Sequence, residues 1–294
     1  IGKVIYTSLL TKNGGIKCDL TITRLEDERF LVVTGGGMGL HDLNWIRNNL
    51  PYNSDIEINN ISESLTTIGV WGPKSRMLLQ KISINDMSNS TFPYMTAKKI
   101  SINEIECLAL RVSYVGELGW EIYAPISKGK MIWDRIYNSS SEFGIIPVGL
   151  AAFESLRIEK GYRLWGNDLS TEYNPYESGI GFTVKLYKDD FIGKEALLNH
   201  KKIGLKKSLT CMTLDKQGAV VMGKEPIMFE DKCIGYVTSA SYGYSIDKGI
   251  VYGYLPTKYA KIGNKVDIIY FGKYYKATIS KDPLFDPENL RIKL

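Results

Sequence analysis

An aspartate that directly follows a glycine-rich turn is the first residue able to do chemistry. Asp19 comes after Gly14-Gly15-Ile16-Lys17-Cys18, at the start of an apolar strand, where Asp is disfavoured. One interpretation is that the carboxylate caps the turn. The other is that it manages a proton or stabilises a cation in a closed pocket. The local sequence leaves both open.

A second candidate is the aromatic and acidic segment 111–123. Two strands flank a glycine-containing turn there, and Tyr114, Trp120, Glu121 and Tyr123 lie close together in sequence. A flat heteroaromatic ligand with ring N–H donors would need an aromatic face and a carboxylate that accepts two hydrogen bonds. A cross-strand aromatic pair with exposed carboxylates is the alternative.

Other motifs give weaker signals. Residues 35–40 lie between a strand and a helix, but Leu40 stands where a dinucleotide-binding motif needs its third glycine, so a tight connection is predicted. Residues 165–168 and 174–181 are irregular polar-aromatic segments of the kind that line sites.

The composition excludes several classes of protein. Thirty-seven Lys and Arg against 32 Asp and Glu give a net charge of +5, without the basic run that nucleic-acid binding needs. Four dispersed cysteines and two histidines argue against a metal site and indicate free thiols in a reducing compartment. No apolar run approaches the ~18 residues of a membrane span. The chain opens on Ile1 and is expected to be the remainder of a longer polypeptide.

The elements that must position these residues fall into two groups. Up to about residue 205, strands alternate with helices; strands are predicted over 4–7, 20–23, 29–34, 68–71, 106–113 and 120–123, and helices over 41–49, 130–138 and 150–160. Gly72-Pro73 begins a further helix that carries Met77, Leu78 and Leu79 inward. Helix 130–138 places Ile132, Trp133 and Ile136 on one face.

After about residue 206 the helix signals vanish. Short strands are predicted over 208–213, 219–221, 233–238, 250–255, 265–270 and 274–279. This pattern indicates a separate all-β barrel or sandwich.

Taken in order, the segments resemble the aminomethyltransferase family, the tetrahydrofolate-dependent T-protein of glycine cleavage and its relatives. The matching stretches are 2–7, 14–20, 114–122, 155–161, 177–182 and 190–195, which cover essentially the whole chain in the family's order. Further stretches are similar to the C-terminal folate-binding half of dimethylglycine and sarcosine dehydrogenases: 19–25, 33–35 with His41-Asp42, 159–163, 239–245 and 283–287.

The resemblance implies an α+β fold: a three-lobed ring of antiparallel-sheet domains with a C-terminal all-β barrel and a central folate channel. The implied lobes are 61–166, which is incomplete because the family's segment before Gly2 is missing, 1–60 with 167–205, and 206–294. The family's catalytic Asp falls on Asp19, its pterin-contacting Tyr and Glu on Tyr114 and Glu121, and a Tyr near the folate pocket on Tyr6.

The implied reaction is capture, as 5,10-methylenetetrahydrofolate, of the iminium carbon released when an N-methyl amine is oxidised. Asp19 would face N5 and N10 of tetrahydrofolate, stabilise the cation and take up a proton, while Glu121 holds the pterin against Tyr114. FAD would act only through a missing N-terminal domain or a partner subunit. The expected location is the cytoplasm or, in a eukaryote, the mitochondrial matrix, with no role for nucleic acid or membrane.

Three alternatives remain. A free-standing glycine-cleavage-type aminomethyltransferase is one, although Phe153 replaces the Arg of those enzymes, which weakens a partnership with a lipoylated carrier. A non-catalytic folate-binding protein is another, but 190–195 lacks the Cys of such relatives. The third is that the shortened chain is inert.

Overall fold

The computed structural model describes residues 1–219 and 221–294, and these form two compact units. One contains residues 1–6, 20–148 and 289–294, and the other contains 7–19 and 149–288. The chain passes between them within two strands, β1 (Val4–Leu10) and β2 (Ile16–Arg24). The three-lobe division stays a prediction.

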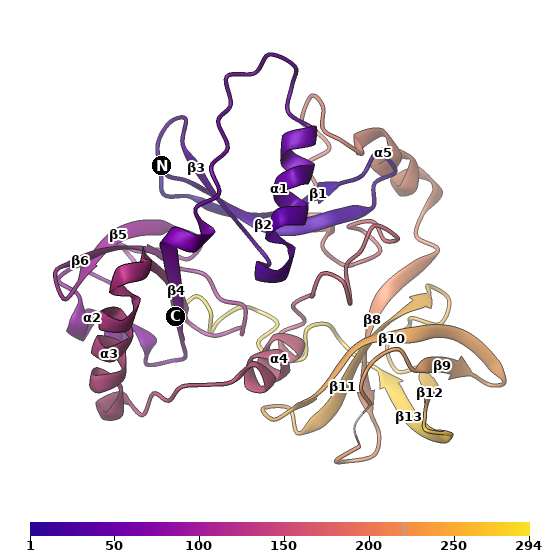
Figure 1. The fold of residues 1–294 in the computed structure, drawn as a ribbon. Coiled ribbons are helices and arrows are strands. Elements are labelled where there is room, and N and C mark those ends of the chain that lie inside the picture. Colours follow the sequence, from indigo (N-terminus) through magenta and orange to yellow (C-terminus); the bar gives the residue numbers. More distant parts are fainter. Residues whose placement is uncertain (220) are drawn as a thin grey trace. The chain divides into compact units, whose positions relative to one another are not determined.

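A four-stranded antiparallel sheet is the centre of the first unit. Its order is β4 (Leu65–Trp71), β7 (Gly119–Pro125), β6 (Ile105–Leu110) and β5 (Ala97–Ile102). Helices α2 (Ser75–Ile82) and α3 (Gly129–Ser140) cover one face (Figure 1). Because side chains alternate along a strand, Ile68, Val70, Trp120 and Ile122 all point into the core beneath these helices.

The opposite face of this sheet carries a second apolar cluster. Leu110 and Tyr123 pack there with Val4 of β1 and with Val33 of β3 (Phe30–Thr34). Beyond a short 3-10 turn, η1 (Gly36–Met38), helix α1 runs over Gly39–Asn48. Its buried Asp42 bonds Nδ1 of His41 at 2.8 Å and accepts a hydrogen bond from the Thr34 hydroxyl, which ties α1 to β3.

The second unit contains the predicted barrel, which is confirmed as a closed six-stranded barrel (Figure 1). Its strands, in chain order, are β8 (Lys207–Leu214), β9 (Pro226–Phe229), β10 (Lys232–Gly243), β11 (Lys248–Pro256), β12 (Lys265–Tyr270) and β13 (Lys273–Ile279). Around the barrel the order is β10-β11-β8-β13-β12-β9, and the interior is apolar. Closure leaves no unpaired sheet edge.

A buried ion pair joins helix α4 (Leu150–Glu159) to the barrel. Nη1 of Arg157 lies 2.8 Å from Oδ2 of Asp168, and each side chain is only 1% exposed. Asp168 also accepts hydrogen bonds from the hydroxyls of Thr238 at 2.5 Å and Ser239 at 2.9 Å, both in β10. The hydroxyl of Tyr254 in β11 donates to the Asp168 carbonyl at 2.7 Å. The helix, the loop after it and two barrel strands therefore share one polar centre.

Two inward side chains were assigned wrongly from the sequence. Met77 is 57% exposed and Trp133 is 45% exposed. The buried stripe of α2 is Ser75, Leu78, Leu79 and Ile82, and that of α3 is Ile132, Ile136 and Ser140. Each misassigned residue adjoins a buried one in sequence, but successive helical positions are turned by about 100°.

Some elements were missed. Strands β5 and β9 and helix α5 (Lys194–Ile203) had not been predicted. The predicted strand 219–221 includes Val220, which lies outside the described residues, while Ala219 and Val221 belong to no strand. In the part of the chain that the structure describes, no helix is both long and apolar enough to cross a membrane.

Replacing Asp168 by Ala is expected to destabilise the protein by about 3–5 kcal/mol, because the buried Arg157 guanidinium would lose its buried counter-ion and keep only the partly exposed Glu154. Urea unfolding followed by circular dichroism measures this change. The matched control is Glu106→Ala, which breaks the exposed Lys99–Glu106 pair and should cost less than about 1 kcal/mol. Equal losses in the two variants would show that the buried pair does not hold the second unit together.

Candidate functional site

The glycine turn before Asp19 is held tightly against a loop of the second unit. A Cβ on Gly15 would lie 2.0 Å from the carbonyl oxygen of Thr171, so only glycine fits. The Ile16 amide donates to the carbonyls of Ser170 at 3.2 Å and Tyr173 at 3.0 Å. The start of β2 is thereby fixed by its backbone.

Asp19 lies in the fourth position of β2 and is half-buried. Ile16, Cys18 and Leu20 are buried on one side of this strand, so Asp19 projects from the other side. The role of Asp19 stays a prediction.

The loop Trp165–Asp168 contacts the strand that follows the glycine turn. The indole N–H of Trp165 donates to the Ile16 carbonyl at 3.3 Å, and Asp168 is the carboxylate of the buried ion pair. The segment 174–181 contacts the barrel instead, where the hydroxyls of Ser178 and Tyr254 lie 2.7 Å apart. Both loops support β2 and the barrel through these contacts.

Glu121 lies in β7 and accepts a hydrogen bond from another residue of the same strand. The hydroxyl of Tyr123 donates to Oε2 of Glu121 at 2.6 Å. Burial raises the pKa of the Glu121 carboxyl above its ordinary value, and the Tyr123 hydrogen bond partly opposes this. Burial and the neighbouring Glu121 raise the pKa of Tyr123 as well, so its hydroxyl stays a donor. The result is a half-buried carboxylate whose Oε2 is held by the Tyr123 hydroxyl.

The loop that carries Tyr114 is fixed at both ends by the β4–α2 turn. At one end, the indole N–H of Trp71 donates to the Val112 carbonyl at 3.0 Å. At the other end, the Gly72 amide and the Ser75 hydroxyl donate to the Leu118 carbonyl at 2.8 and 3.0 Å. Tyr114 itself is half-buried. The structure therefore places Tyr114 and Glu121 in one rigid loop–strand segment of the first unit.

Two features of this segment differ from the simplest sequence interpretation. Trp120 points into the helix-covered core, where it packs edge-on against Phe92, so it offers no aromatic face beside Glu121. The carboxylates of Glu117 and Glu121 are not exposed, which argues against the alternative of an aromatic pair with exposed acids. Tyr6 lies half-buried in β1, at the last residue of the first unit's N-terminal piece.

Sequence reasoning missed the role of Tyr123 as the donor that orients Glu121. The available signal was their spacing of two residues within a strand, which places both side chains on one face. The involvement of residues 71–75 in holding the Tyr114 loop had no local signal, because it depends on contacts more than 40 residues apart in sequence.

The cysteines and metal ligands offer no competing chemistry in the described residues. All four cysteines are free, as predicted. Burial raises the pKa of Cys107 to about 11 and that of Cys211 to about 12, so these two are thiols and weak nucleophiles. Among residues 1–219 and 221–294, no cluster of three or more His, Cys, Asp or Glu side chains could hold a metal ion.

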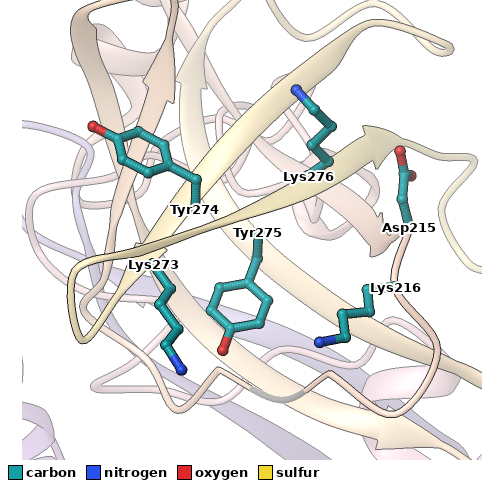
Figure 2. A pocket seen from close by; sticks show the side chains of 6 residues that line it. All are labelled: Asp215, Lys216, Lys273, Tyr274, Tyr275 and Lys276. Carbon is teal, nitrogen blue, oxygen red and sulfur yellow. The ribbon is translucent and has the colours of Figure 1, made fainter.

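A hollow of about 520 Å³ lies on the barrel. It is lined by Asp215, Lys216, Lys273, Tyr274, Tyr275 and Lys276. Figure 2 shows Lys273 and Tyr275 leaving β13 on one side and Tyr274 leaving it on the other. The hollow is shallow and contains none of the residues assigned from the sequence, so we do not place the site there.

Comparison with known families identifies both parts of the chain. A family described as "GCVT N-terminal domain" matches residues 1–188. A second, described as "Glycine cleavage T-protein C-terminal barrel domain", matches residues 207–286. The second match covers the closed barrel seen in the structure.

Two curated relatives are similar over almost the whole chain. Mitochondrial dimethylglycine dehydrogenase of Rattus norvegicus is 38% identical over 299 residues, which cover 100% of this chain and 35% of that protein. An aminomethyltransferase of Thermoanaerobacter pseudethanolicus is 37% identical over 277 residues, which cover 94% of this chain and 74% of that protein. The chain thus spans about a third of the dehydrogenase.

A solved structure has the same fold. The glycine cleavage system aminomethyltransferase T of Bartonella henselae superposes with a TM-score of 0.85 at 24% identity, covering 97% of this chain and 76% of that one.

Replacing Glu121 by Gln is expected to change how stability depends on pH. The raised pKa means that, as pH rises above the ordinary value of 4.5, the unfolded state loses its proton first, so the wild type loses stability relative to the variant. Each pH unit between the folded and unfolded pKa contributes about 1.4 kcal/mol. Urea unfolding at several values from about pH 4 to about pH 8 measures this difference. The control is Glu106→Gln, on an exposed position of β6; a Glu121→Gln difference that stays constant with pH would contradict the expectation.

Proposed function

Because the chain belongs to the glycine cleavage T-protein family of aminomethyltransferases, we propose that it transfers a one-carbon unit to tetrahydrofolate. The carbon would come from the oxidative demethylation of an N-methyl amine of the dimethylglycine or sarcosine type. The product would be 5,10-methylenetetrahydrofolate. The 38% identity to a dimethylglycine dehydrogenase over the whole chain supports this choice of donor.

The half-buried Glu121 carboxylate, held by the Tyr123 hydroxyl, is the observation that carries the proposal. A pterin presents an amino group and a ring N–H side by side, and a carboxylate can accept from both. Tyr123 fixes Oε2 of Glu121, and burial increases the strength of hydrogen bonds to this group. Tyr114, on the loop held by Val112 and Leu118, would supply an aromatic contact to the same ring.

Asp19 would act on the transferred carbon. A carboxylate stabilises a cationic iminium carbon and accepts the proton that the attacking nitrogen releases. The polar side of β2 presents Asp19, and the glycine turn and Trp165 hold this strand in place. Tyr6, from the neighbouring strand β1, is proposed as a further folate contact.

FAD does not fit the residues present. The β2–β3 pair, the four-stranded sheet and the barrel are antiparallel, and Gly36–Met38 forms a 3-10 turn instead of a phosphate-binding βα junction. Oxidation of the amine would therefore belong to an FAD-bearing domain or partner subunit. The location in the cytoplasm or mitochondrial matrix stays a prediction.

A free-standing aminomethyltransferase is the second candidate. The T. pseudethanolicus relative supports it, since the chain covers 74% of that protein. Activity with an aminomethyl-loaded lipoyl carrier protein, and none during dimethylglycine oxidation by an added FAD enzyme, would favour this candidate. The reverse result would favour the dehydrogenase-linked reaction.

Titration calorimetry with tetrahydrofolate tests the binding role. Wild-type protein is expected to bind with a dissociation constant of about micromolar order, and Glu121→Ala to lose this binding, because the N–H donors of the ligand would lose their acceptor. Glu106→Ala, an exposed acid in the same sheet, should bind like the wild type. Absence of binding by folded wild-type protein would refute the proposed function.

Asp19→Asn is expected to leave tetrahydrofolate affinity within a few-fold of wild type and to lower turnover by about 10²–10⁴-fold. The amide keeps the shape of the side chain but neither stabilises a cation nor accepts the proton. Formation of 5,10-methylenetetrahydrofolate, followed with a coupled dehydrogenase, measures turnover. Full activity of this variant would show that Asp19 has no part in the chemistry.

A further inference from the structure

The indole of Trp71 lies across two glycines of the four-stranded sheet. A Cβ on Gly69 would be 2.0 Å from Cη2 and 2.2 Å from Cζ3 of this ring, and a Cβ on Gly119 would be 2.3 Å from Cδ1. Any larger residue at either position would collide with the ring. The two glycines thus form a flat floor, and one face of the indole covers it.

This floor adjoins Glu121. Gly69 is the cross-strand partner of Glu121 in the β4–β7 register, and Gly119 precedes Glu121 by two residues on the same face of β7. Side chains of directly opposed residues are about 4.5–5.5 Å apart at their Cβ atoms. The six-membered ring of Trp71 therefore covers the residue that pairs with Glu121 across the two strands.

The ring has a fixed orientation. Its Nε1–H donates to the Val112 carbonyl at 3.0 Å, and the glycine floor prevents it from sinking further into the sheet. Trp71 as a whole residue is half-buried. A preorganised aromatic surface loses little conformational entropy when a ligand stacks on it.

We propose that Trp71 is a ligand-binding and specificity-determining residue, whose outer face stacks on the flat ring that Glu121 holds. The inference rests on the proposed function, since it takes this ring to be the pterin of tetrahydrofolate. The inference adds selection for ligand shape, because a planar amino-pyrimidinone ring can hydrogen-bond to Glu121 and stack on the indole at the same time. A non-planar ligand with the same N–H donors would hydrogen-bond to Glu121 but would not stack on the indole.

Two substitutions distinguish the contribution of the aromatic ring of Trp71 from that of its hydrogen bond to Val112. Trp71→Leu removes the flat surface and should weaken tetrahydrofolate binding by about tenfold to a hundredfold. Trp71→Phe keeps an aromatic face but loses the N–H donor to Val112, and should bind within about threefold of wild type. Stacking acts equally on bound substrate and transition state, so KM should rise in Trp71→Leu with little change in kcat.

Tryptophan fluorescence gives a readout that a structural role would not produce. Titration of the wild type with tetrahydrofolate should quench emission through stacking on Trp71. Trp71→Phe should retain affinity and lose most of that quench. Trp133→Leu, an exposed tryptophan on α3 of the same unit, is the matched control and should change neither affinity nor the quench that binding causes.

The outcomes distinguish this inference from the proposed function. If folded wild-type protein does not bind tetrahydrofolate, the proposed function and this inference both fail. If the wild type binds and Trp71→Leu binds equally well, or Trp71→Phe keeps the full quench, only the role of Trp71 is refuted. Should Trp71→Leu fail to fold, the affinity and quench of Trp71→Phe decide the question.

Discussion

The second unit depends on a guanidinium and a carboxylate that are both out of water. Arg157 and Asp168 would each cost several kcal/mol to bury alone, so the helix, the loop and the barrel strand that supply their partners must meet in one arrangement. The same loop continues to Trp165, which holds the carbonyl of Ile16. The loop that supplies the counter-ion of Arg157 therefore also holds the strand that carries Asp19. In this way the position of that strand depends on the packing of α4 on the barrel.

In the first unit, the register of two strands has the corresponding role. Pairing of β4 with β7 brings Gly69 opposite Glu121 and Trp71 opposite Gly119. Alternation then places Trp71 and Glu121 on the face opposite the helices, while Trp120 and Ile122 fill the helix-covered face. A slip of one residue would exchange the two sets. The pairing of β4 with β7 therefore determines both the face on which Glu121 lies and the apolar side chains that fill the core on the other face.

Local sequence predicted much of this arrangement and missed what depends on distant contacts. The barrel, the antiparallel sheets and the glycine turn before Asp19 follow from alternation and turn chemistry, which act over a few residues. The inward assignment of Met77 failed because a run of three apolar residues does not say which of them faces the core. Trp165 and Trp71 had no local signal for their roles, since their partners Ile16 and Val112 are far away in sequence. The roles given to Asp19, Tyr114, Glu121 and Tyr6 rest on the resemblance and stay predictions.

The contact of the Trp71 indole with Gly69 and Gly119 also limits which substitutions this sequence can accept and in which order. While the indole is present, alanine at position 69 or 119 collides with it, so neither glycine can be replaced first. Once the indole is lost, position 69 becomes permissive, and a side chain acquired there would in turn block its return. Position 119 stays restricted, because a Cβ there would still lie 2.4 Å from the Val70 carbonyl oxygen. Positions 69 and 71 therefore form an epistatic pair in which the order of substitutions matters, and a side chain gained at 69 would make loss of the aromatic residue irreversible.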